Sequence, residues 1–89
     1  IVFQDSSTNS LVTGSRIINS GIEATYEGLS ISTDNVTATH NVLRGNYFGA
    51  YIWASLNAVF TDNIVTNSSD SGIYVQVSSK AKIANNHFG

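Results

Sequence analysis

The chain of 89 residues has no cysteine, no proline and no methionine. Without cysteine it can form neither a disulfide framework nor a metal site built on thiolates. Its two histidines and dispersed carboxylates indicate no other metal site, and we expect no cofactor. No apolar run approaches the ~18 residues of a membrane-spanning helix, so we expect no membrane partner.

Charge is also scarce. Charged residues make up 11% of the chain, less than half of the ~25% usual in globular domains. The net charge is −2, and the cationic residues are scattered at Arg16, Arg44, Lys80 and Lys82. Because no basic tract is present, we expect neither nucleic acid nor an anionic membrane surface as a partner.

A short pattern of a polar bend, an asparagine and apolar neighbours is repeated along the chain. Three copies cover residues 36–43, 58–65 and 81–88, and their asparagines, 22 and 23 residues apart, are Asn41, Asn63 and Asn86. A looser copy at 11–18 has Arg16 at the asparagine position, 25 residues before Asn41. A short period of strand-type residues predicts a solenoid in which each repeat is one coil of backbone.

A glycine followed by the pattern apolar-x-apolar is the second landmark, and it occurs at Gly28, Gly49 and Gly72. We interpret these glycines as turn residues where a loop re-enters a strand. Together the two landmarks predict three short strands in each coil, in the second coil about residues 36–39, 42–43 and 50–54.

Alternation along the strands predicts which side chains face the interior. Stacking the repeats gives five inward columns: Leu29, Ala50 and Ile73; Phe3, Ile31, Ile52 and Val75; Leu11, Val36, Ala58 and Ala81; Thr13, Ala38, Phe60 and Ile83; Ile18, Leu43, Val65 and Phe88. The asparagines are expected at tight bends, in a left-handed backbone conformation, with their amides bonded from coil to coil as a ladder.

These two landmarks resemble the right-handed parallel β-helix repeat of pectate-lyase-like proteins, mannuronan epimerases and phage tailspikes, over about residues 11–89. The resemblance implies an all-β fold, a single-stranded right-handed parallel β-helix of roughly three to four coils of about 22–25 residues. It also implies an extracellular, periplasmic or virion-surface location and a polysaccharide ligand. We interpret residues 1–89 as one β-helix segment, an excerpt of a longer solenoid.

The resemblance transfers no catalytic residue. The Asp-Pro-His motif of the epimerases needs a proline, which this chain lacks, and the calcium-binding aspartate cluster of pectate lyases has no counterpart within one coil. Among the acids, Glu27 and Asp70 are weak catalytic candidates, two coils or roughly 10 Å apart, where glycoside cleavage needs two carboxylates about 5–10 Å apart. The alternative is that both are solvated loop carboxylates.

An aromatic group is the best candidate site. Tyr51, Trp53 and Tyr74 are expected on the outward side of the strands that follow the glycines, with Tyr51 stacked on Tyr74 and Trp53 two residues along. Flat rings with polar edges suit the apolar faces of sugars, so these three are predicted to bind carbohydrate. Alternatively, the rings pack under a loop or a neighbouring chain.

A second outward column of Ile17, Val42 and Ile64 predicts a contact with another chain, such as a homotrimer, or with the remainder of a longer chain. Two functions stay open. The first is a non-catalytic segment that binds polysaccharide or forms a structural shaft. The second is a fragment of a polysaccharide lyase, glycoside hydrolase or C5-epimerase with catalytic residues partly outside this chain.

Overall fold

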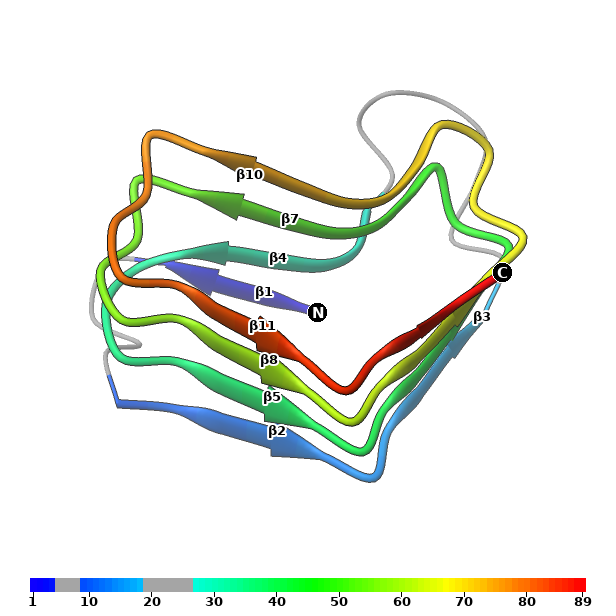
Figure 1. Cartoon of the computed structure of the whole chain (residues 1–89), viewed down its shortest axis with the longest axis horizontal. Helices are drawn as coiled ribbons and strands as arrows, with labels where there is room; N and C mark the ends of the chain where they lie inside the picture. The colour runs from blue at the N-terminus through cyan, green and yellow to red at the C-terminus, as the bar shows by residue number, and fades with distance from the viewer. Residues whose placement is uncertain (5–8, 19–26) are drawn as a thin grey trace.

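The chain folds as a parallel β-solenoid of about three turns, in which each coil contributes one short strand to each of three sheets (Figure 1). The computed structural model describes residues 1–4, 9–18 and 27–89, and these residues form strands and turns without a helix. The all-β solenoid predicted from the repeat is therefore confirmed.

The first sheet, which we call the long-strand sheet, has the order β1-β4-β7-β10. Its strands are β1 (Val2–Gln4), β4 (Glu27–Ser32), β7 (Phe48–Trp53) and β10 (Ser71–Gln76). The second sheet contains β2 (Leu11–Thr13), β5 (Thr37–Thr39), β8 (Val59–Thr61) and β11 (Lys82–Ala84). The third sheet contains β3 (Arg16–Ile18), β6 (Val42–Arg44), β9 (Ile64–Thr66) and β12 (His87–Phe88).

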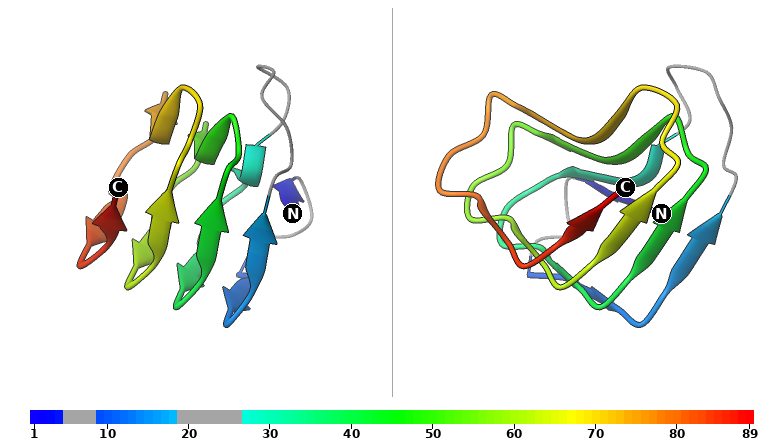
Figure 2. Two further views of the ribbon diagram at one scale, coloured as in Figure 1. Left: turned by 90° about the vertical axis from the view of Figure 1, so that its right-hand side faces the viewer. Right: turned by 45° about the vertical axis from the view of Figure 1, so that its right-hand side comes forward.

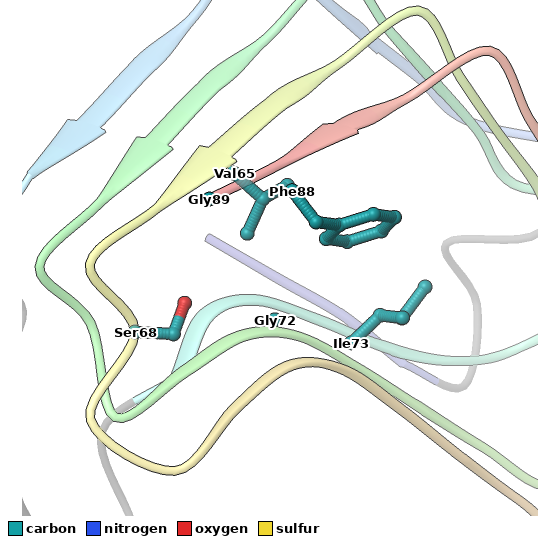
Figure 3. Close-up of a pocket in the computed structure, with 6 residues that line it drawn as sticks. All are labelled: Val65, Ser68, Gly72, Ile73, Phe88 and Gly89. Carbon is teal, nitrogen blue, oxygen red and sulfur yellow. The ribbon is translucent and has the colours of Figure 1, made fainter.

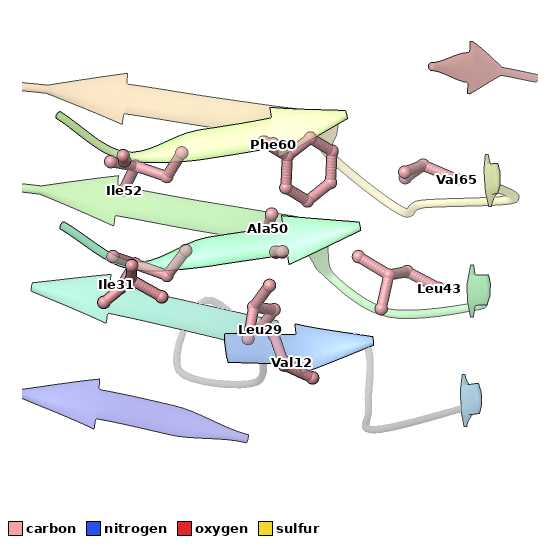
Figure 4. Packing of buried hydrophobic residues seen from close by; sticks show 11 residues of the cluster. Val12, Leu29, Ile31, Leu43, Ala50, Ile52, Phe60 and Val65 are labelled. Atoms are coloured by element: carbon pink, nitrogen blue, oxygen red, sulfur yellow. The ribbon is translucent and has the colours of Figure 1, made fainter. Parts of the chain in front are cut away.

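All strand pairs in the described residues are parallel (Figure 2). Their register places corresponding residues of successive coils opposite one another. From residue 29 to residue 65 this register buries the side chains that alternation predicts to face inward (Figure 4). The fully buried apolar residues of this stretch are Leu29, Ile31, Val36, Ala38, Leu43, Ala50, Ile52, Ala58, Phe60 and Val65. In the last described coil Val75, Ile83 and Phe88 keep the register of Ile52, Phe60 and Val65 but are 40%, 39% and 45% exposed.

The register of the first described coil differs from the prediction by one residue. Val12 pairs with Ala38 and is 7% exposed, whereas Leu11 is 62% exposed. Likewise Ile17, rather than Ile18, lies opposite Leu43 and packs against the core. The predicted inward positions of Leu11, Thr13 and Ile18 are therefore wrong.

The cause is the length of this repeat. The backbone N–H of Ser15 donates to Oδ1 of Asn41 across 26 residues, so Ser15, and not Arg16, occupies the ladder position. Because side chains alternate along a strand, a shift of one residue turns each of them to the opposite face. Phe3 has its backbone in register with Ile31, and its predicted side-chain direction lies outside the described part of the chain.

Two charge insertions would test this register. We expect Val12→Asp to lower the free energy of unfolding by at least about 2 kcal/mol, because it introduces a carboxylate into an apolar interior. Leu11→Asp, one residue away on the outer surface, is expected to change it by less than about 0.5 kcal/mol. Urea unfolding followed by circular dichroism measures both, and a larger loss for Leu11→Asp would restore the register predicted from sequence.

The predicted asparagine ladder is present inside the bends between the second and third sheets. Nδ2 of Asn41 donates to Oδ1 of Asn63 at 3.0 Å, and Nδ2 of Asn63 donates to Oδ1 of Asn86 at 3.1 Å. The left-handed conformation, however, belongs to the residue before each asparagine: φ is +58° at His40, +56° at Asp62 and +57° at Asn85. The asparagine conformation expected from sequence is wrong, because the preceding residue makes the turn.

Candidate functional site

Close packing leaves no room for a side chain at the three glycines that begin the long-strand repeats: Gly28 and Gly49 each approach the backbone of the next coil, and Gly72 lies against the ring of Phe88. A Cβ on Gly49 would collide with the carbonyl oxygen of Gly72 and with the side chain of Val65, and a Cβ on Gly28 would lie 2.7 Å from the Gly49 oxygen. None of the three has a positive φ. The turn role predicted for them is therefore wrong, and what the structure requires at these positions is the absence of a side chain.

Gly49 also changes the alternation of its strand. A Cβ at Gly49 would point at Val65 in the interior, and the next residue, Ala50, is fully buried. Two consecutive residues therefore face inward, which places the ring of Phe48 on the same side of the sheet as Tyr51 and Trp53, where neighbouring rings cover it to 9% exposure.

Four rings form a cluster on this outer side. Tyr51 and Tyr74 are register partners whose ring centroids lie 5.3 Å apart with planes inclined by 13°, so their predicted stacking is confirmed. Phe48 lies 5.6 Å from Tyr51 and 5.4 Å from Tyr74, and Tyr47 meets Phe48 edge-on at 4.8 Å. Phe48 and Tyr47 were not predicted to belong to this cluster, and their position before Gly49 is the signal in the sequence that points to them.

Trp53 lies at the far end of the same strand. It is 47% exposed, and Tyr74 is 39% exposed. The phenolic oxygen of Tyr51 donates to Oε1 of Gln76 at 2.8 Å, and Gln76 is the register partner of Trp53. We call Phe48, Tyr51, Trp53 and Tyr74 the aromatic face. All three residues predicted to bind carbohydrate belong to it.

The neighbouring strand β4 carries small polar side chains beside these rings. Ser30 is the register partner of Tyr51, and Ser32 follows Ile31, whose partner Ile52 precedes Trp53. Small serine side chains on β4 therefore lie next to large rings on β7. A serine is too small to cover the side of the Tyr51 ring that faces β4. This arrangement combines an apolar wall with neutral hydroxyl groups.

The two candidate acids lie at the beginning of the strands, at the opposite edge from Trp53. Glu27 is the register partner of Phe48, whose partner on the other side is Ser71. Asp70 directly precedes Ser71, and its Oδ2 accepts a hydrogen bond from the Ser71 hydroxyl at 3.3 Å. The backbones of the two acids are thus two strand spacings apart, or about 10 Å. Their catalytic role stays a prediction.

The third sheet presents a different outer surface from the one predicted. Its outward column runs Arg16, Val42, Ile64 and His87, because Ile17 faces the interior opposite Leu43. The continuous apolar column predicted for a subunit contact is therefore wrong, and an exposed arginine stands at one of its positions. The homotrimer stays a prediction that rests on Val42 and Ile64 alone.

A cavity of about 450 Å³ opens where the long-strand and third sheets meet (Figure 3). Among the residues that line it, Ser68 has a buried hydroxyl without a hydrogen-bond partner. The cavity is lined by Val65, Ser68, Gly72, Ile73, Phe88 and Gly89. None of these side chains is titratable, so we assign the cavity no chemical role. Residues 1–4, 9–18 and 27–89 contain no cluster of three side chains able to hold a metal and no helix able to span a membrane.

Comparison with known proteins gives one match. The family model described as "Right handed beta helix region" matches residues 1–89, the whole sequence. Neither the curated proteins nor the solved structures gave a match.

Proposed function

The chain belongs to the right-handed β-helix family, and from this premise we propose that it binds a polysaccharide on the aromatic face without transforming it chemically. The fold supports a structural or carbohydrate-associated role in general, and the outer surface of the long-strand sheet favours the second. Under this proposal the segment works at an extracellular, periplasmic or virion surface, as part of a longer solenoid or of an oligomer.

The observation that carries the proposal is the exposed Trp53 beside the stacked pair Tyr51 and Tyr74. A large ring left half in water on a flat sheet indicates a binding surface. The apolar face of a sugar ring can pack against such rings, while phenol, amide and serine groups meet its hydroxyls. Because Tyr74 covers one side of Tyr51, the uncovered side toward Ser30 is where we expect a sugar to pack.

Replacing Trp53 by alanine is expected to weaken polysaccharide binding about tenfold or more, the ~1.4 kcal/mol of one well-packed ring. Ile64→Ala is the matched control, because Ile64 has the same 47% exposure but lies on the third sheet. Affinity electrophoresis through gels that contain individual polysaccharides measures both variants. Equal binding by Trp53→Ala and the unmodified chain, or an equal loss in Ile64→Ala, would contradict the proposal.

The alternative function is a part of a polysaccharide lyase, hydrolase or epimerase. The register of Glu27 and Asp70 on either side of Phe48 favours it. Their backbones are about 10 Å apart, and the carboxyl groups of a catalytic pair lie about 5–10 Å apart. Polysaccharide depolymerisation that is lost in both Glu27→Gln and Asp70→Asn, with binding retained, would select this alternative over binding alone.

A further inference from the structure

The charges around the aromatic face bear on the kind of polysaccharide that it accepts. The chain has four cationic side chains, and all of them lie in the described residues. Arg16 and Arg44 are exposed on the third sheet, and Lys82 is exposed on the second sheet. Lys80 is exposed in the turn between β10 and β11, four residues after Gln76. None of the four belongs to the long-strand sheet.

The charged side chains at the described strands of this sheet are acidic. Glu27 begins β4, three residues before Ser30, and is half-buried, while Asp70 precedes β10 and is exposed. The other polar side chains of the described outer surface are neutral hydroxyls and the Gln76 amide. This part of the sheet thus combines neutral hydrogen-bonding groups and rings with negative charge at one edge.

Such a surface discriminates against an anionic sugar. A carboxylate or sulfate brought against Tyr51 and Trp53 would lose water, and the strands of the long-strand sheet carry no lysine or arginine to give it a charge-assisted hydrogen bond. It would also approach Glu27, whose like charge repels it at low ionic strength. A neutral sugar has neither cost, because its hydroxyls exchange hydrogen bonds with groups such as Ser30 and Gln76.

We infer that the aromatic face is selective for a neutral polysaccharide, one without carboxylate or sulfate groups, that packs its sugar rings against Tyr51 and Trp53. The inference rests on the proposed function and adds the substrate class. A bridging divalent cation does not alter it, because the described residues hold no group of three acids or histidines around which a metal would bind.

The test compares neutral glycans (β-glucan, mannan, xylan) with acidic ones (polygalacturonate, alginate) by affinity electrophoresis at low and moderate salt, with calcium or with a chelator. We expect at least one neutral glycan to bind in a Trp53-dependent manner, and the acidic glycans to bind at least tenfold more weakly, with or without calcium. Glu27→Gln is expected to strengthen polyuronate binding about two- to fivefold at low salt and to leave neutral glycans unchanged. Asp62→Asn removes an exposed carboxylate elsewhere and is expected to change neither.

The outcomes separate the two claims. Polyuronate binding that exceeds that of every neutral glycan and is lost in Trp53→Ala would overturn the neutral selectivity and leave the aromatic face as the binding site. An unchanged polyuronate affinity in Glu27→Gln would overturn the role of this carboxylate in selectivity. Binding of every glycan that is indifferent to Trp53→Ala would overturn the proposed function itself.

Discussion

Replacing Asn63 by aspartate is expected to lower the free energy of unfolding by about 3 kcal/mol or more, or to abolish the cooperative unfolding transition. Nδ2 of Asn63 donates to the carbonyl oxygen of Ala38 at 3.1 Å and to Oδ1 of Asn86 at 3.1 Å. Its Oδ1 accepts from the backbone N–H of Asn41 at 2.9 Å and from Nδ2 of Asn41 at 3.0 Å. One buried side chain thus joins three coils.

The aspartate keeps the accepting oxygen but replaces the two donated hydrogens by a second oxygen. That oxygen would face the Ala38 carbonyl and the Asn86 amide oxygen in a site that water does not reach, since Asn63 is almost fully buried. The buried acceptors lose their donor and a charge is left unpaired, and each of these effects costs more than the ordinary loss of a surface hydrogen bond.

Asn57→Asp is the matched control for this prediction. Nδ2 of Asn57 donates to Oδ1 of Asn35 at 3.2 Å, also one coil away, but on the exposed side of a turn. Aspartate tolerates the left-handed backbone of this position, and water can replace the lost partner, so we expect a change within about 0.5 kcal/mol. Urea unfolding followed by circular dichroism measures both variants. Equal losses of unfolding free energy would mean that burial does not determine how strongly the ladder stabilises the fold.

The same ladder explains why the sequence predicts the fold well and the first coil poorly. Asn63 and Asn86 recur at nearly constant spacing because each must meet the next across one coil, so the spacing alone gives register. In the first described coil a serine, Ser15, stands at this position and only its backbone N–H joins the ladder. Both strands there contain adjacent apolar residues, Leu11-Val12 and Ile17-Ile18. The sequence pattern therefore fits equally well whichever residue of each pair faces inward.

The candidate site was predictable where alternation holds and hidden where it fails. Tyr51, Trp53 and Tyr74 follow a regular period of two, and parallel register alone makes two tyrosines at matching positions stack. Phe48 was missed because counting by two across Gly49 places it inside. Sequence does not reveal that a glycine adds a second consecutive inward position, because this depends on how closely the next coil approaches.

The charge distribution around the face depends on the fold in the same way. Along the sequence, Arg16 and Arg44 are separated by 28 positions, yet register places both on the outer side of the third sheet, in adjacent strands. The sequence pattern places Arg16 at the asparagine position of a bend. In the structure Ser15 has that position, and Arg16 lies on the outer surface opposite Val42. The neutral selectivity proposed for the aromatic face therefore follows from residue placement and not from the net charge of the chain.

Phe60→Ala is expected to lower the free energy of unfolding by about 3–5 kcal/mol, the cost of an unfilled cavity in a core that cannot collapse. Phe60 is fully buried, and the fully buried Ala38 lies opposite it in the preceding coil. Backbone bonds hold the coils at a fixed spacing on both sides, from Val59 to Val36 at 2.9 Å and from Lys82 to Ala58 at 2.8 Å. Phe60 thus lies between Ala38 and Ile83 on a hydrogen-bonded framework, and the fixed coil spacing keeps its neighbours from moving inward to fill the space.

Phe88→Ala, which removes the same ring from a side chain that is 45% exposed, is expected to cost only about 1–2 kcal/mol. Urea unfolding monitored by circular dichroism compares the two variants in one experiment. A loss for Phe60→Ala no larger than that for Phe88→Ala would mean that the interior of the solenoid is not closely packed. The difference between them measures burial, because the two substitutions are chemically identical and both side chains point into the solenoid, Phe60 from the second sheet and Phe88 from the third.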